Sequence, residues 1–147
     1  MGDWGGDLES FSRGDGKIFL VKIYDIQFED GAEPEPHEIQ TTLFLKKQGK
    51  DVKFLAPKNR DHIKTPDSAM DGLKWEIKAP VSAGSRTIEH VLRSATKQSP
   101  NVIIDLRRCK MSDERALHQI SHEAAKRKST LKKLLVVTKS QKAIDLK

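Results

Sequence analysis

Hydrophobic and polar residues alternate along this chain in patterns that predict both helices and strands. Between Ile88 and Ala95 apolar residues recur at i, i+3, i+4 and i+7, the spacing of a helix with one buried face. The apolar runs Asn101 to Leu106 and Leu134 to Thr138 are typical of buried strands. Together these patterns predict an α/β fold.

The predicted elements follow the order helix, strand, strand, strand, helix, strand, helix, strand. We expect the first helix over His37 to Gln48, a second opened by Ser85 and a third capped by Ser112. The first three strands are expected at 51–56, 67–70 and 73–78. Helical crossovers imply parallel strands, whereas the hairpin adds an antiparallel pair, so we predict a mixed central sheet flanked by helices.

The first 36 residues differ from the rest in charge. Residues 1–36 hold 3 Lys and Arg against 9 Asp and Glu, while residues 79–147 hold 15 against 6. Lys17 to Phe28 predicts a strand or hairpin arm, and Glu29 to Pro36 is an acidic linker broken by prolines. We therefore divide the chain into an acidic leader, 1–36, and a domain, 37–147. The basic body fits either a polyanion-binding surface or an ordinary solvated surface.

Composition excludes several classes of protein. With 36% hydrophobic and 33% charged residues, the chain is expected to be globular, and its apolar runs are too short to cross a bilayer. Met1 to Asp7 lacks the plan of a signal peptide, and the single cysteine, Cys109, excludes an intrachain disulfide. We expect a cytoplasmic protein with no membrane partner.

The segment from Pro66 to Lys78 carries the most chemical information. Asp71-Gly72 favours a two-residue type I′ hairpin turn, in which both residues have positive φ. That turn sets Ser68 opposite Trp75 and Asp67 opposite Glu76, and it assigns Trp75 to the core. Since side chains alternate between faces, Asp67, Glu76 and Lys78 share one face, with the two carboxylates about 5 Å apart at Cβ.

Two carboxylates this close repel each other unless a cation lies between them. Oxygen ligands suit Mg²⁺, so Asp67 and Glu76 are predicted metal ligands. A bound divalent metal can polarise a phosphodiester and activate water, and Lys78 can stabilise the developing negative charge. The residues therefore favour metal-dependent phosphodiester hydrolysis. The alternative is the charged solvent face of a surface hairpin.

The pattern Pro66-Asp67, eight residues, then Glu76-Ile77-Lys78 resembles the restriction-endonuclease-like PD-(D/E)XK core. This resemblance implies that residues 37–147 form a nuclease domain with Asp67, Glu76 and Lys78 as catalytic residues. Because similar nucleases often carry a polar residue at the end of the second helix, it also implies a catalytic role for Gln98. Glu38 is a candidate third carboxylate, although we expect it at the surface.

From His37 to Lys147 the chain also resembles the C-terminal nuclease domain of CdiA-type contact-dependent growth-inhibition toxins. The resemblance lies in HEIQTTLFLKKQGKDVKFL, TPDSAMDGLKWEIKAP, SRTIEHVLRSATKQSPNVIIDLRR and KKLLVVTKSQKAIDL. It implies hydrolysis of RNA, with transfer RNA as the expected substrate and DNA as the alternative substrate. It also implies an immunity protein as partner and delivery into a target-cell cytoplasm. A stand-alone role remains open.

Two further segments are candidates for substrate binding. Ser85, Arg86 and Thr87 open the second helix, whose free N–H groups favour a phosphate, although simple capping explains them equally well. The basic run Lys126-Arg127-Lys128 either contacts substrate backbone or complements the third helix's dipole. Asp105 is expected to pair with Arg107, Arg108 or a lysine.

Two alternatives to a metal-dependent nuclease stay open at this point. One is a non-catalytic nucleic-acid-binding or toxin-neutralising module with the same fold. The other is a metal-independent RNase, in which Lys, His or Ser/Thr side chains perform the acid–base steps. The intact set of Asp67, Glu76 and Lys78 favours metal-dependent catalysis over the non-catalytic module.

Overall fold

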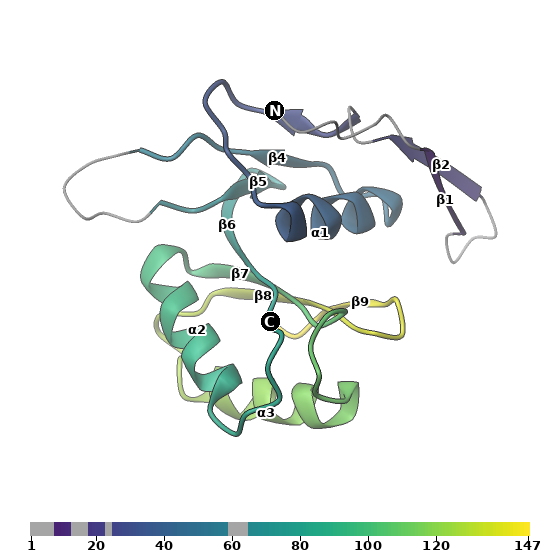
Figure 1. Cartoon of the computed structure of the whole chain (residues 1–147). Helices are drawn as coiled ribbons and strands as arrows, with labels where there is room; N and C mark the ends of the chain where they lie inside the picture. The colour runs from purple at the N-terminus through teal and green to yellow at the C-terminus, as the bar shows by residue number, and fades with distance from the viewer. Residues whose placement is uncertain (1–7, 13–17, 23–24, 59–64) are drawn as a thin grey trace.

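The computed structural model describes residues 8–12, 18–22, 25–58 and 65–147 (Figure 1). Its helices are α1 (Pro36–Lys47), α2 (Thr87–Gln98) and α3 (Asp113–Ala125). Its strands are β1 (Leu8–Ser12), β2 (Ile18–Lys22), β3 (Gln27–Phe28), β4 (Val52–Phe54), β5 (Ser68–Met70), β6 (Leu73–Lys78), β7 (Asn101–Asp105), β8 (Lys133–Val137) and β9 (Ala143–Asp145). In the described ranges, no helix is long and apolar enough to cross a membrane.

Strands β3 to β9 form one sheet in sequence order, and β1 and β2 form a separate antiparallel pair. Strands β6, β7 and β8 are parallel, and β4, β5 and β6 are joined by antiparallel pairing. The predicted α/β class, mixed sheet and element order are therefore confirmed. The finer restriction-endonuclease-like topology stays a prediction.

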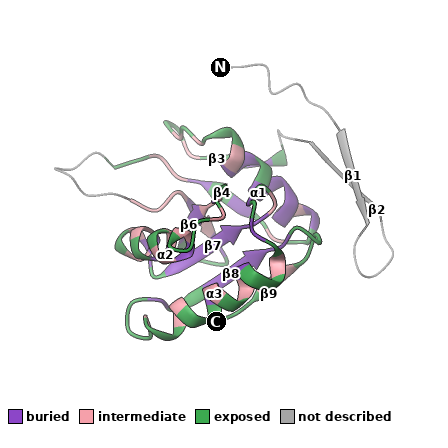
Figure 2. Ribbon diagram, turned by 60° about the horizontal axis from the view of Figure 1, so that its bottom comes forward, coloured by how far each residue is buried: buried purple, intermediate pink, exposed green. Residues whose placement is uncertain are grey.

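Helix α1 lies on one side of the sheet, and α2 and α3 lie on the other (Figure 1). Strand β7 serves both cores, because Ile103 belongs to the cluster with α1 and Ile104 to the cluster with α2 and α3. The strands at the centre are buried, whereas α2 and α3 expose their outer faces (Figure 2). Trp75 joins the α1 cluster with 4% of its surface exposed, as predicted.

The hairpin between β5 and β6 has the predicted turn. Asp71 and Gly72 have φ values of 53° and 75°, and the ladder pairs Met70 with Leu73 and Ser68 with Trp75. Gly72 tolerates this left-handed backbone because it has no Cβ. Local turn chemistry thus fixes the register that leads to the acidic residues.

The helix termini match the predictions unevenly. Ser112 caps α3 by accepting a hydrogen bond from the backbone N–H of Arg115, as predicted. The N-cap of α2 is Arg86 without a side-chain cap, so the prediction that Ser85 caps this helix is wrong. The physical reason is a preceding turn, in which the N–H of Thr87 donates to the carbonyl of Gly84 at 3.1 Å and delays the start of the helix.

Part of the predicted acidic leader belongs to the sheet. Strand β3 pairs with β4, and Ile26 is buried in the α1 cluster, so residues 25–36 pack with the body. Residues 23–24, inside the predicted strand 17–28, lie outside the described residues. The division at residue 36 stays a prediction. Strand β9, which antiparallel pairing adds beyond β8, was not predicted.

Candidate active site

A pocket of about 350 Å³ lies at the open end of the β5–β6 hairpin, beside the carboxyl end of β6. The first turn of α1 and Val91 of α2 complete its wall. Its ionisable lining residues are Glu35, His37, Glu38, Asp67, Glu76, Lys78 and Arg108. The structure thus brings together the three residues that the hairpin register predicted.

Glu76 is the central residue of this pocket. Only 3% of its surface is exposed, and its Oε2 atom lies 3.3 Å from Nζ of Lys78. Its Oε1 atom is buried with no hydrogen-bond partner in the described part of the chain. Because Glu76 is buried, the alternative of a purely solvent-facing hairpin does not hold for this side chain.

Asp67 lies immediately before β5, and its Oδ2 atom accepts a hydrogen bond of 3.3 Å from the N–H of Ile77. Burial raises the pKa of Glu76 to about 8, and the hydrogen bond and negative charge of Asp67 add to this effect. The positive charge of Lys78 opposes it. The negative charge of Asp67 therefore disfavours ionisation of Glu76.

Glu38 contributes a third carboxyl group and is buried, with 7% of its surface exposed. The expectation that it lies at the surface was therefore wrong. Its Oε1 atom accepts a hydrogen bond of 2.8 Å from the N–H of Glu35, which closes a capping box at the start of α1. Burial raises the pKa of Glu38 to about 7, the Glu35 N–H opposes this, and Asp67 raises the pKa further.

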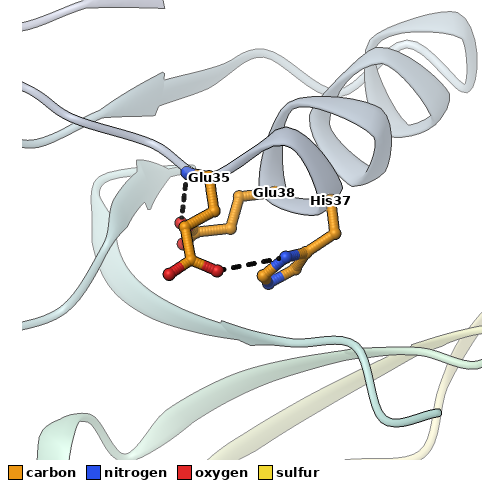
Figure 3. Close-up of side chains that lie close together, drawn as sticks. All are labelled: Glu35, His37 and Glu38. Atoms are coloured by element: carbon orange, nitrogen blue, oxygen red, sulfur yellow. Dashed lines mark hydrogen bonds and ion pairs between the residues drawn. The ribbon is translucent and has the colours of Figure 1, made fainter.

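The side chains of Glu35, His37 and Glu38 converge below the first turn of α1 (Figure 3). One ligand atom from each lies within 4.8 Å of the others, a spacing that could hold a metal ion. Glu35 Oε2 lies 3.3 Å from Nδ1 of His37. Burial lowers the pKa of His37, and the positive charge of Arg108 lowers it further. The negative charges of Glu35, Asp67 and Asp105 oppose this shift.

Sequence reasoning missed Glu35 and His37 as site residues. The signal that could have indicated them is the pair Glu35 and Glu38 around Pro36, because acids three apart at a helix start form a capping box. What the pair does not indicate is burial, which depends on how α1 docks on the sheet.

Asp105 ends β7, and two arginines, Arg107 and Arg108, come directly after this strand near the pocket. Asp105 forms an ion pair with Arg107, one of the predicted partners, with Arg107 Nη2 2.8 Å from Asp105 Oδ2. Thr41 Oγ1 donates a hydrogen bond of 2.6 Å to the same oxygen. Arg107 also lies over the ring of Phe44, 4.8 Å from its centroid. Arg108, which was not assigned to the site, donates from Nε to the carbonyl of Ala79 at 2.8 Å.

The structure does not bring Gln98 to this pocket. Ser99, the next residue, donates from Oγ to the carbonyl of Lys74 at 2.8 Å, near the start of β6. The pocket lies at the other end of that strand. The predicted position fails because α2 runs antiparallel to β6, so the middle of the helix, at Val91, faces the pocket.

The two predicted substrate-binding segments also lie outside the pocket lining. Arg86 pairs with Glu89, and Thr87 Oγ1 donates to Ser82 Oγ at 3.2 Å, while Ser85 lies in the turn before α2. Helix α3 ends at Ala125, so the basic run is its C-cap and the residues beyond. Lys126 and Arg127 each form an ion pair with Glu123, and Lys128 is exposed. The backbone of Lys132 bonds to Pro100, which sets this segment at the amino end of β7.

The lining residues fit a hard divalent cation. Four carboxyl groups, from Glu35, Glu38, Asp67 and Glu76, line the pocket, and the buried Glu76 Oε1 has no hydrogen-bond donor among the described residues. Oxygen ligands of this kind suit Mg²⁺, while His37 adds a nitrogen ligand that suits Mn²⁺ or Zn²⁺.

The fold and the pocket define a small α/β domain with an acid-lined site at the carboxyl ends of its parallel strands. The family model for the contact-dependent growth inhibition CdiA C-terminal domain matches residues 64–143, which is more than half of the chain. The chain therefore belongs to this family, and the resemblance predicted from its sequence is confirmed at that level.

One solved structure shares the fold. It is described as a CdiA-CT/CdiI toxin and immunity complex from Burkholderia pseudomallei, with a TM-score of 0.60 and 19% sequence identity. The similarity covers 82% of this chain and 98% of that chain. Among curated proteins, no sequence matches.

Proposed function

We propose that this growth-inhibition domain is a toxin that hydrolyses phosphodiester bonds in RNA with the help of a divalent metal. The proposed substrate is transfer RNA. The observation that carries the proposal is the buried carboxyl group of Glu76, held beside Asp67 with one oxygen unpartnered. A buried carboxyl group with a raised pKa, as at Glu76, is unfavourable for folding when it ionises, so its presence in a pocket supports a functional role.

The metal ligands in this proposal are Asp67 and Glu76. Glu38 lines the same pocket, where its ligand atom lies within 4.8 Å of those of Glu35 and His37. A divalent cation bound there would supply Lewis-acid polarisation of the phosphate and a more acidic water. The oxygen-rich set favours a hard ion such as Mg²⁺.

Lys78 has the role of stabilising negative charge on the phosphate. Its Nζ atom lies 3.3 Å from Glu76, which restrains the ammonium group beside the ligands, and about a quarter of its side chain remains exposed toward the pocket. A cation restrained before substrate binds needs little reorganisation when charge develops.

The decisive test incubates the protein with total transfer RNA and, separately, with plasmid DNA, in Mg²⁺ and then in EDTA. We expect cleavage of RNA in Mg²⁺ and none in EDTA. Cleavage that persists in EDTA would support a metal-independent RNase with His37 and Lys78 as acid–base residues. Absence of cleavage in every condition would support the non-catalytic binding module.

Two variants tie the activity to the pocket. Lys78→Ala is expected to fold normally and to lose at least 100-fold in rate, the range typical of removing one charge-stabilising donor (about 10²–10³). Lys74→Ala is its matched control, because Lys74 is an exposed lysine on the same strand that does not line the pocket. Equal activity of both variants would remove Lys78 from the mechanism.

A cognate immunity protein is the proposed partner. The support comes from the solved structure with the shared fold, which is described as a complex of a toxin with an immunity protein. The test is co-expression of the domain with a candidate immunity protein, followed by co-purification of the two and rescue of cell growth.

A further inference from the structure

A second pocket, of about 270 Å³, adjoins the acidic pocket. The two share His37, Ala79 and Arg108 in their walls. Gln40, Asp105 and Arg107 complete the second pocket. Any ligand that enters the acidic pocket from this side therefore passes Arg108.

The two pockets differ in electrostatic character. The acidic pocket holds carboxyl groups from four residues, whereas Asp105 supplies the carboxyl group of the second pocket. That carboxylate is already satisfied, because Arg107 donates to it from Nε at 3.0 Å and from Nη2 at 2.8 Å. Thr41 donates to it as well. The neutralised pair leaves Arg108 as the cation that sets the charge of the second pocket.

Arg108 is oriented by the backbone rather than by an acid. Its Nε donates to the carbonyl of Ala79, and among the described residues no carboxylate forms an ion pair with it. The N–H of Lys110 donates to the carbonyl of Val81 at 2.8 Å, so the loop after β7 is tied to the loop after β6. The exposed Arg108 side chain is thereby held at the carboxyl ends of parallel strands.

We propose that Arg108 binds the phosphate next to the scissile one, and that the second pocket holds the nucleotide attached to it. The inference rests on the proposed hydrolysis in the acidic pocket. A guanidinium group offers parallel N–H donors that match phosphate, and a position fixed in advance loses little freedom on binding. The carboxyl ends of parallel strands are also where open α/β sheets bind ligands. The substrate is thus a polynucleotide strand that spans both pockets.

The first experiment measures binding of a labelled single-stranded RNA to Lys78→Ala protein in Mg²⁺ over a range of KCl concentrations. Adding Arg108→Gln should raise Kd roughly tenfold and lower the slope of log Kd against log salt by about 0.7, the value of one phosphate contact to a single strand. Lys74→Gln removes the same charge from an exposed lysine that lines neither pocket and should change neither quantity. Arg108→Lys should restore the slope but only part of the affinity.

The second experiment uses the protein with Lys78 intact. Arg108→Gln should raise KM for RNA roughly tenfold and leave kcat within about threefold, because the contact is made before and during the reaction alike. A dinucleoside monophosphate, which carries only the scissile phosphate, should be hydrolysed equally by both proteins. Thermal unfolding verifies that Arg108→Gln folds.

The outcomes separate this inference from the function on which it rests. If the protein cleaves nothing but Arg108→Gln still weakens RNA binding with the smaller slope, the phosphate contact stands and hydrolysis fails. If RNA is cleaved and Arg108→Gln binds it with unchanged Kd and slope, the phosphate contact is refuted. An equal loss in Lys74→Gln would also refute it, because the effect would then be one of overall charge.

Discussion

Glu76→Gln tests whether the buried carboxyl group is under electrostatic stress. Glutamine keeps the shape of the side chain and removes its titration. The pKa of Glu76 rises from 4.5 to about 8 on folding, so the folded state holds a proton that the unfolded state has lost. The stabilising contribution of the protonated group is fully present below pH 4.5 and is lost as the pH rises to about 8.

The full shift corresponds to on the order of 5 kcal/mol at about 1.4 kcal/mol per pH unit. Glu76 lines a pocket that is open to solvent, which screens its charge, so we expect about 2–3 kcal/mol to be measurable. Near pH 8, where Glu76 ionises, removing the ion pair with Lys78 costs the variant up to about 1 kcal/mol, whereas at pH 5 the protonated group has no ion pair to lose. In EDTA, Glu76→Gln should therefore be about as stable as the parent at pH 5 and more stable at pH 8.

Thermal unfolding followed by circular dichroism measures this difference. For a chain of this length, about 2 kcal/mol corresponds to a change of roughly 4–8 °C in Tm. Subtracting the parent from the variant at each pH cancels the other titrating groups, and Glu114→Gln, on the exposed face of α3, serves as the control. Mg²⁺ at pH 8 should raise the Tm of the parent and not that of the variant. A difference that is constant from pH 5 to pH 8 would refute the reasoning.

Three further predictions concern the supports of the site. Asp105→Asn leaves Arg107 without its carboxylate and should lower stability by about 2–4 kcal/mol, measured by urea unfolding, whereas an unchanged midpoint would show that Thr41 and Gln40 suffice. Gly72→Ala, at φ 75°, should destabilise by about 1 kcal/mol in the same assay, and a gain in stability would contradict the observed turn. Thr42→Val replaces a buried hydroxyl that has no partner among the described residues and should be neutral or stabilising by up to about 1 kcal/mol; a loss would indicate a bound water.

The site was predictable where its geometry is local. The turn at Asp71-Gly72 fixes the register, and the register determines the facing of Asp67, Glu76 and Lys78 without long-range information. Glu38 was misjudged because its burial arises from the docking of α1 on the sheet, a contact between segments far apart in the sequence. Its sequence neighbourhood indicates a helix start and nothing about depth.

Errors of position have a similar origin. Gln98 and the basic run from Lys126 were correctly predicted to lie at helix ends. Which edge of the sheet each helix end reaches depends on the direction of the strands. Because β6 and β7 are parallel, the helix between them must end at the edge of the sheet where the strands begin. The pocket lies at the edge where the strands end. A sequence pattern that identifies parallel strands therefore also predicts that helix starts, and the loops after strands, lie nearer to the site.

The two-residue turn of the hairpin has a consequence for how this domain can change over generations. Spacing between Asp67 and Glu76 depends on the backbone of Asp71 and Gly72, and not on which apolar side chains fill the cores beneath. Substitutions that keep those cores apolar and filled can therefore accumulate without moving the acids. A fold retained at 19% identity is what such an arrangement permits. In this domain, drift in the packed interior and the spacing of the acidic side chains are physically separable.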